Sequence, residues 1–234
     1  MTKSVESRRV SSDETNIAGA EHLHFACNGC GDCCRRHRVA VTHHDLARLS
    51  SVVDEPAERL VEWLAPAELD FEAESASFVT LPGGPRLMLL AHAGGGCRFL
   101  TSDNRCSVYE GRPRDCEIYP FVLDRDEGRR VVRLTLFDPA GCGDLAATPT
   151  KLATLASSDA ERWAEVDDYR RLVKRWNRLA GHRLRFRYRL GTAGEFLDFI
   201  GARSAREGTL SCAARVAPDE PSSRRSCYPP PCRR

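Results

Sequence analysis

Cysteine spacing constrains the fold of this chain more than any other feature, because eight of its eleven cysteines fall into two groups. The first group has the pattern Cys-x2-Cys-x2-Cys-Cys, and the second is more widely spread. Two successive Cys-x2-Cys spacings let one tight turn direct three thiolates at a common centre. We therefore predict that both groups bind metal. The eight candidate ligands are Cys27, Cys30, Cys33, Cys34, Cys97, Cys106, Cys116 and Cys142.

The spacing leaves the identity of the metal open. Thiolates favour zinc, copper(I) or iron–sulfur centres over magnesium or calcium. A bacterial ferredoxin pattern needs x3-Cys-Pro after its third cysteine, but here Cys34 follows Cys33 at once. A simple zinc ribbon would show two Cys-x2-Cys knuckles, which the second group lacks. Zinc and iron, the latter including an iron–sulfur cluster, therefore both remain candidate cofactors, and the number of metals stays open.

Neighbouring residues in the first group affect how many ions the site can hold. Side chains of adjacent residues in an extended segment point to opposite sides. We therefore expect Cys33 and Cys34 to serve two ions of a multinuclear centre, or one of them to lie behind the ligands. His24, His37 and His92 are close to the cysteines in sequence and are candidates to replace one of them.

These motifs resemble the YkgJ family of cysteine-cluster proteins, described as zinc- or iron-chelating. The resemblance covers roughly residues 24–145. It is carried by Phe25-x-Cys27-x2-Cys30-Gly31-x-Cys33-Cys34-Arg35, Cys97-x-Phe99-Leu100 and Cys106-x2-Tyr109-x2-Arg112-Pro113-x2-Cys116-x2-Tyr119-Pro120-Phe121. The resemblance implies a cysteine-bound metal or iron–sulfur centre, and it implies little about activity. A related cluster occurs in flagellin lysine N-methylases, which adds methyl transfer as an alternative. The chain has no Gly-rich fingerprint for a methyl donor.

Composition and patterning favour an α+β fold. With 41% hydrophobic and only 7% aromatic residues, the core should be modest, and a bound metal would add stability. We expect a small, irregular, metal-organised cysteine-cluster domain with short helices and a β-hairpin, followed by a helical extension. The expected division is a disordered N-terminus at 1–20, the metal-binding domain at 21–148, a basic helical extension at 149–202 and a disordered tail at 203–234.

Local patterns predict the elements of the metal-binding domain. Thr42-x-x-Asp45 has the form of a capping box at the start of a helix. A second helix is expected from Pro56 through Leu64, with proline in the first turn. Strands joined by tight turns are expected at 78–81 with 86–92, and at 121–123 with 130–137.

The extension has a helical pattern after Pro149. Ser158-x-x-Glu161 predicts its start, and Gly181 predicts its end. Its apolar face is expected to consist of Trp163, Val166, Tyr169, Val173 and Trp176. Arg183 to Leu190 alternates strictly between apolar and basic residues, which predicts a strand. A last short helix is expected at 195–200.

Positive charge is concentrated in this extension. Nine Lys or Arg residues and no Asp or Glu lie between Arg170 and Arg189, although the whole chain carries only +2. Such a patch attracts phosphate backbones or acidic proteins. A nucleic-acid or protein adaptor acting through residues 170–189 is therefore an alternative function. We expect Phe186 and Tyr188 to face the core.

The remaining features bear on location and activity. Residues 1–20 lack an apolar signal region, and no stretch approaches the roughly 20 apolar residues of a membrane span. We therefore expect a cytoplasmic protein with reduced thiols and no membrane partner. The tail cysteines Cys212, Cys227 and Cys232 are expected to be exposed thiols. Whether the chain is an enzyme stays open. The main hypothesis is zinc or iron chelation, and the first alternative is an iron–sulfur-dependent enzyme, acting in redox chemistry or protein-lysine methyl transfer.

Overall fold

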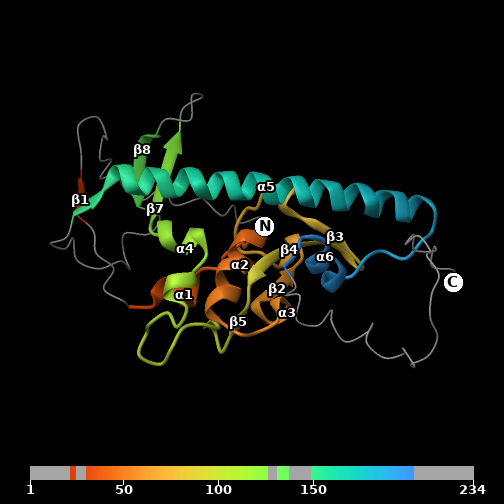
Figure 1. Ribbon diagram of the computed structural model, residues 1–234, viewed down its shortest axis with the longest axis horizontal. Coiled ribbons are helices and arrows are strands. Elements are labelled where there is room, and N and C mark those ends of the chain that lie inside the picture. The colour runs from red at the N-terminus through yellow and green to blue at the C-terminus, as the bar shows by residue number, and fades with distance from the viewer. Residues whose placement is uncertain (1–21, 25–29, 126–130, 137–148, 203–234) are drawn as a thin grey trace, which may run out of the picture. The chain divides into compact units, whose positions relative to one another are not determined.

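The computed structural model describes residues 22–24, 30–125, 131–136 and 149–202 (Figure 1). All of them belong to one compact unit. The described part is a mixed α+β fold of short helices and small antiparallel sheets with one long helix, as predicted. The predicted disorder at 1–20 and at 203–234 lies outside the described residues.

A three-stranded antiparallel sheet lies at the centre of this unit. Its order is β2 (Val61–Leu64), β4 (Gly84–Leu90) and β3 (Val79–Leu81). The last four residues of the central strand, 87–90, are all buried. β3 and β4 form the predicted hairpin, and Gly83 in the turn between them has φ 86°, a conformation that favours glycine.

Of the helices that precede this hairpin, α2 (His43–Val52) agrees with the prediction and α3 (Ala57–Leu60) differs from it. α2 begins at Thr42 with the predicted capping box. The second predicted helix is right only at its start, because α3 ends after four residues. Residues 61–64 instead pair with the buried residues 87–90 of β4. Strand pairing with an apolar neighbour therefore outweighs helix propagation here.

The long helix α5 (Leu152–Arg185) differs from its predicted bounds at both ends. The chain is already helical six residues before Ser158, so the predicted start is wrong. Gly181 does not end the helix, and the space around its α-carbon is open. The predicted strand at 183–190 is also wrong. Its first three residues finish α5, and the chain then turns at Arg187, which has φ 59°.

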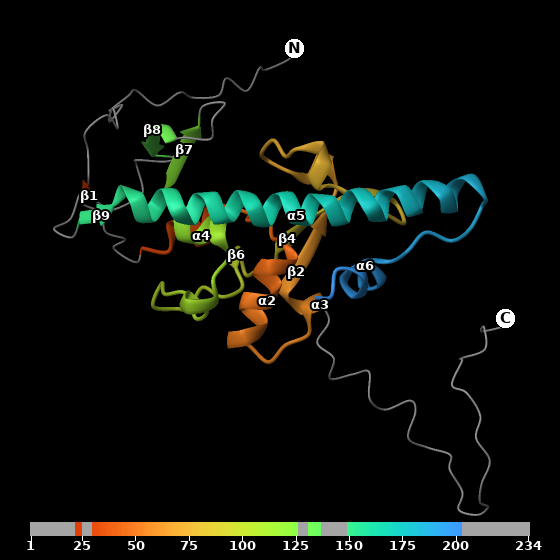
Figure 2. The same cartoon turned by 45° about the horizontal axis from the view of Figure 1, so that its top comes forward.

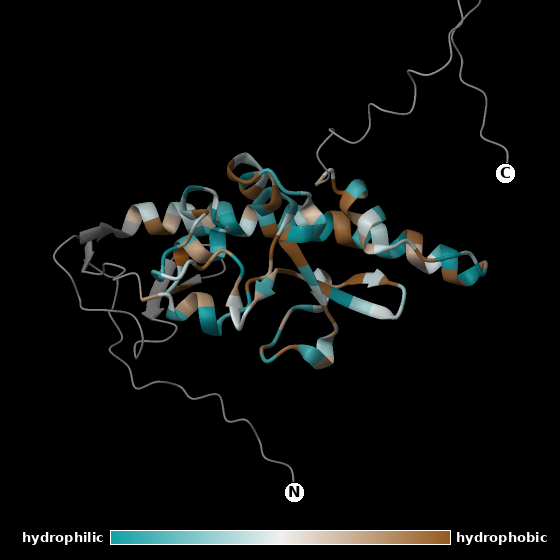
Figure 3. Ribbon diagram, turned by 90° about the horizontal axis from the view of Figure 1, so that it is seen from below, coloured by the Kyte–Doolittle hydropathy of each residue, from teal (hydrophilic) through white to brown (hydrophobic). Residues whose placement is uncertain are grey.

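α5 covers the sheet (Figure 2). Tyr169, Val173 and Trp176 are buried as predicted, and they pack in the same core as Phe196 of α6 (Ala193–Phe199). Figure 3 shows apolar positions where the sheet and α6 meet the long helix. α6 confirms the predicted last helix and begins with a capping box at Thr192.

Side chains of α5 also satisfy the backbone at the outer edge of β3. The Trp176 indole N–H donates to the carbonyl oxygen of Thr80 at 3.0 Å. The Asn177 side chain accepts from the Thr80 N–H at 2.8 Å and donates to the carbonyl of Phe78 at 2.7 Å. An uncovered strand edge is a site for unwanted pairing. α5 therefore closes this edge.

Smaller elements surround this core. The predicted hairpin is present as β7 (Phe121–Arg125) with β8 (Val131–Leu136), and Leu123 packs with Ile118 and Leu155 in a second small cluster. The other elements are β1 (His22–His24) with β9 (Pro149–Lys151), α1 (Asp32–Arg36), β5 (His92–Ala93) with β6 (Gly96–Cys97), α4 (Arg114–Ile118), and the 3-10 turns η1 (Pro66–Glu68), η2 (Ser75–Ser77) and η3 (Tyr109–Gly111). No helix within the described ranges is long and apolar enough to span a membrane.

Candidate metal centre

Cys33 and Cys34 lie on the short helix α1, which corrects the expectation of an extended segment. Gly31 precedes the helix with φ 72°, a left-handed conformation that glycine adopts readily. The two Sγ atoms are 3.9 Å apart. Around a tetrahedral zinc with Zn–S bonds of about 2.3 Å, two sulfur ligands lie about 3.8 Å apart. The adjacent thiols are therefore spaced to share one ion.

α1 lies against the start of the second cysteine group. A β-carbon built on Gly96 would be 3.0 Å from the carbonyl oxygen of Cys34 and 3.3 Å from Cα of Arg35. Glycine at this position therefore allows the helix and β6 to approach closely. Cys97 is the second residue of β6, and it pairs in register with His92 of β5.

The other two cysteines of the second group are held by separate elements. Cys106 forms an isolated β-bridge with Leu100. Together with Cys97 it packs against the main hydrophobic core. Cys116 lies on α4, whose N-terminal cap is Pro113, a proline expected to restrict the backbone around this thiol.

The pKa values of Cys97 and Cys116 indicate that Cys33 of the first group lies near the second group. The hydrogen bond with Cys34 and burial raise the pKa of Cys33. Burial raises the pKa of Cys97, and the neighbouring Cys106 and Cys33 add to this effect. Burial raises the pKa of Cys116 well above its usual value, and Cys97, Asp115, Cys106 and Cys33 raise it further. These thiols are therefore protonated at neutral pH, and a bound metal would displace their protons.

The six cysteines that the structure describes form no disulfide, and they are Cys30, Cys33, Cys34, Cys97, Cys106 and Cys116. Within the described ranges, no three of their sulfur atoms all lie within 4.8 Å of one another. Enclosing one ion with four of them therefore requires some side-chain rotation. Cys27, Cys142 and the three tail cysteines fall outside the described residues.

The histidines near the cysteines have different surroundings. His37 Nε2 lies 3.1 Å from the Tyr119 hydroxyl, and the two rings are in contact. This ring is thus already engaged by a partner from the end of α4. His92 remains a candidate ligand because it is the strand partner of Cys97. The structure does not describe the side chain of His24.

Arg35, next to Cys34, links two loops of the candidate site. Arg35 donates to the carbonyl oxygen of Cys30 at 2.9 Å and to the Asn104 side chain. It therefore connects the backbone at Cys30 to the loop between Cys97 and Cys106. Asn104 has φ 65°, which asparagine tolerates better than most residues. No pattern in the sequence indicates this contact, which joins two residues 69 positions apart.

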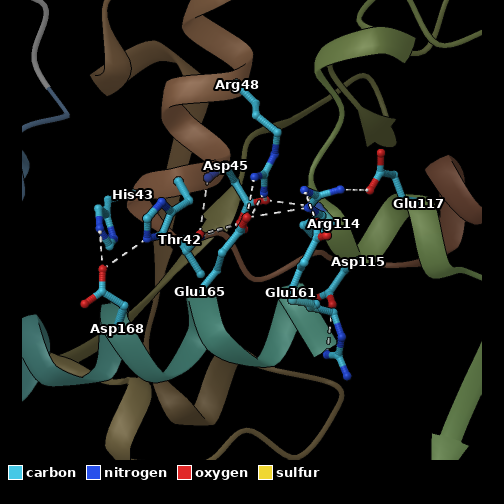
Figure 4. Close-up of polar contacts among 12 residues, drawn as sticks. Thr42, His43, Asp45, Arg48, Arg114, Asp115, Glu117, Glu161, Glu165 and Asp168 are labelled. Carbon is cyan, nitrogen blue, oxygen red and sulfur yellow. Dashed lines mark hydrogen bonds and ion pairs between the residues drawn. The ribbon is translucent and has the colours of Figure 1, made fainter. Parts of the chain in front are cut away.

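A buried carboxylate fixes the helix that carries Cys116 (Figure 4). Asp45 is 4% exposed and accepts hydrogen bonds from the Thr42 backbone N–H and hydroxyl, each at 2.8 Å. It also accepts from the backbone N–H of Arg114, the first residue of α4, at 3.0 Å. The capping-box pattern predicted the helix start correctly, but it gave no indication of this contact with α4.

α5 supports the same arrangement through ion pairs (Figure 4). Glu165 binds both terminal nitrogens of Arg48 at 2.7 and 2.6 Å. Arg114 pairs with Glu161 at 2.7 Å, and Arg162 pairs with Asp115 at 3.1 Å. The charge of Arg114 is therefore directed to carboxylates. The long helix thus positions α4 and, with it, Cys116.

Comparison with known proteins agrees with this site. Residues 26–136 match a family described as "CxxCxxCC: Putative zinc- or iron-chelating domain", and the match covers just under half of the 234 residues. No curated protein and no solved structure matches the chain. The matched region contains every candidate ligand from Cys27 to Cys116, and Cys142 lies beyond its end.

Proposed function

We propose, from the match of residues 26–136 to the CxxCxxCC family model, that cysteines of both groups bind one shared metal centre. The observation that carries the proposal is the close approach of α1 and β6, where a β-carbon on Gly96 would lie 3.0 Å from the carbonyl oxygen of Cys34. In agreement with it, Cys33 on α1 contributes to the raised pKa values of Cys97 on β6 and Cys116 on α4. The shared ion would join these three elements.

The proposed ligands come from both groups. Cys33 and Cys34 supply a pair of sulfurs at a suitable spacing, and Cys97, Cys106 and Cys116 surround the same region. Cys30 is attached to this region through Arg35. Cys27 and Cys142 complete the predicted set of eight. A metal bound here would act by holding thiolates and, if it is iron, would also exchange electrons.

Iron in an iron–sulfur cluster is the more specific form of this proposal. A single tetrahedral zinc needs four ligands. The described residues alone offer six cysteines, so a cluster or a second ion has enough ligands. An enzyme using such a cluster, for redox chemistry or protein-lysine methyl transfer, stays an alternative hypothesis. The absence of disulfides at these cysteines supports our further proposal of a reducing compartment such as the cytoplasm.

Metal and sulfide analysis of the anaerobically purified full-length protein tests the proposal. Cys33→Ser and Cys116→Ser should each lower the amount of bound metal, whereas Cys212→Ser, which removes a tail thiol, should leave it unchanged. Visible absorption together with inorganic sulfide would identify an iron–sulfur cluster, and zinc without colour would identify a zinc centre. Equal metal content in all three variants would refute the shared centre. Circular dichroism confirms that each variant is folded.

We propose nucleic-acid binding at the C-terminal end of α5 and the residues that follow it as a second candidate function, because two aromatic side chains expected in the core are exposed there. Phe186 and Tyr188, expected in the core, are 62% and 70% exposed. They alternate with basic residues, and the guanidinium of Arg185 lies 6.0 Å from the centre of the Phe186 ring. Exposed aromatic rings among arginines suit the stacking of single-stranded bases.

The basic surface is smaller than the sequence predicted. Arg170, Arg171 and Arg189 are paired with Glu74, Asp168 and Glu195, respectively. Anisotropy with a labelled single-stranded oligonucleotide tests the proposal. Binding should weaken as salt rises and should weaken further in Tyr188→Ala, whereas Phe71→Ala, at another exposed ring, should bind normally. Salt-independent binding, or equal binding by both variants, would rule this function out.

A further inference from the structure

A second group of metal-binding side chains lies between α2 and α5 and contains no cysteine. His43 and His44 are the first two residues of α2, and Asp168 lies on α5 (Figure 4). Oδ2 of Asp168 is 3.2 Å from Nε2 of His43 and 3.0 Å from Nε2 of His44. Within the described ranges, this is the one group of three such residues whose ligand atoms all lie within 4.8 Å of one another.

The two imidazoles are held in place by their neighbours. The His43 and His44 ring centroids are 4.0 Å apart. The His43 ring also stacks on Tyr169, with an interplanar angle of 27°, and Tyr169 is buried in the main core. One turn further along α2 and one turn earlier on α5, Arg48 binds Glu165 and fixes the spacing between the two helices. The ligand atoms are therefore positioned without any ion.

The charge state of the group also suits a cation. Burial lowers the pKa of His43, and the neighbouring His44 lowers it further. Hydrogen bonds from Arg171 and His44 lower the pKa of Asp168. Arg171 contacts the carboxylate through Oδ1, which leaves Oδ2 toward the histidines. Neutral imidazole and ionised carboxylate are the forms that bind transition metals.

We propose that His43 Nε2, His44 Nε2 and Asp168 Oδ2 bind a divalent transition-metal ion such as zinc, at a site separate from the cysteine centre. Tetrahedral zinc with bonds of about 2.0–2.1 Å places its nitrogen and oxygen ligands about 3.3 Å apart. The observed separations of 3.0 and 3.2 Å require little adjustment. Two histidines and one carboxylate leave a position for water or for a ligand of small size.

Zinc titration of the full-length protein, followed by equilibrium dialysis, tests this site. The unmodified chain should bind one more zinc ion than Asp168→Asn, or bind that ion at least about tenfold more tightly, because removing a ligand costs at least as much as removing its supporting partner. His44→Ala, at a side chain that is 40% exposed, should behave in the same way and provides a second variant that should fold. Asp167→Asn removes the adjacent carboxylate and should bind as the unmodified chain does.

Cobalt distinguishes this site from the cysteine centre. Cobalt bound by thiolates gives an intense sulfur-to-metal charge-transfer band, whereas nitrogen and oxygen ligands do not. The difference spectrum between the cobalt-loaded unmodified chain and Asp168→Asn should therefore lack this band. The site is refuted if Asp168→Asn and His44→Ala both bind zinc as the unmodified chain does, or if the ion they lose carries the sulfur band. Cys33→Ser should instead lose the cobalt that gives the sulfur band and keep the ion bound by the histidines and Asp168. The two proposals can therefore fail independently of each other.

Discussion

Gly96 lies where α1 meets β6, at the junction between the two cysteine groups. Any side chain at this position would contact backbone atoms of Cys34 and Arg35 at 3.0 and 3.3 Å. Backbone cannot rotate aside as the end of a flexible side chain can. A methyl group would therefore move α1 by a few tenths of an ångström relative to Cys97, which follows Gly96 on β6.

We predict that Gly96→Ala weakens zinc binding at the cysteine centre by on the order of tenfold, comparable to the loss of a residue that supports a metal ligand. A competition titration with a chromogenic chelator measures the change. Gly181→Ala is the matched control, because its β-carbon meets nothing within 4 Å and a helical alanine should add about 0.5–1 kcal/mol of stability. Unchanged affinity in Gly96→Ala would mean that the two groups do not share an ion.

The sequence indicated which residues are candidate ligands but not how their side chains are oriented. The Cys-x2-Cys spacings singled out Cys30, Cys33 and Cys34 without any knowledge of the fold. The helical conformation of α1 was not predicted, because it depends on a left-handed Gly31 and on contacts with a segment about 65 residues away. Asp45 shows the same limit, since its bond to the backbone of α4 depends on tertiary structure alone.

At the scale of elements, α5 shows which sequence patterns are reliable. The 3.6-residue periodicity correctly predicted the buried face with Tyr169, Val173 and Trp176, because burial against a core imposes that period. Its ends were wrong, because capping residues and a single glycine are tolerated inside a helix that packing stabilises. The alternation after residue 183 predicted a strand, but the described chain offers it no strand partner.

Glu165 gives α5 a pH-dependent attachment to α2. Burial favours a higher pKa for Glu165, but the hydrogen bonds and charge of Arg48 outweigh it, so the pKa is lowered. We predict that Glu165→Gln lowers the free energy of unfolding by about 1–2 kcal/mol at neutral pH. A depressed pKa stabilises the fold above the unfolded value of about 4.3, and this contribution is lost as the pH falls through the folded value.

Urea unfolding at fixed metal concentration, at neutral and acidic pH, measures this contribution. The difference between the unmodified chain and Glu165→Gln should shrink as the pH falls below about 4.3. Glu161→Gln, at a side chain that is 55% exposed, should have a smaller effect at every pH. A difference that persists unchanged in acid would show that the carboxylate charge is not the cause.

Asn177 provides a second attachment, to the edge of the sheet. It bonds both Thr80 N–H and the Phe78 carbonyl, and these groups would otherwise lie unpaired on β3. We predict that Asn177→Ala destabilises the protein by about 1–3 kcal/mol, because it leaves partly buried backbone groups without partners. Thermal unfolding measures the change, and Arg178→Ala, one residue along the same helix, should change the stability little. An equal loss in both variants would argue against closure of the strand edge.

At the scale of the whole molecule, the apolar core and the cysteine centre are built from largely different residues. The main core joins α2, the three-stranded sheet, α5 and α6, and its fully buried members include Leu46, Val79, Met88, Val173 and Phe196. α1, in contrast, has no buried residue. The sequence predicted a modest core and a fold that a bound metal helps to stabilise. It did not indicate how much the apolar core contributes to stability without the metal. Summed composition does not show which residues pack together.

Hydrogen exchange with and without a chelator measures how far the metal centre stabilises the rest of the protein. A helix without buried residues depends on its other contacts, and metal binding free energy adds directly to folding where ligands are ordered by the ion. We predict that chelation increases exchange in α1 and in residues 97–116. β4 and the segment of α5 from Tyr169 to Trp176, whose inner face is buried, should stay protected, because their packing needs no ion. Loss of protection throughout residues 30–202 would show instead that the metal holds the entire fold together.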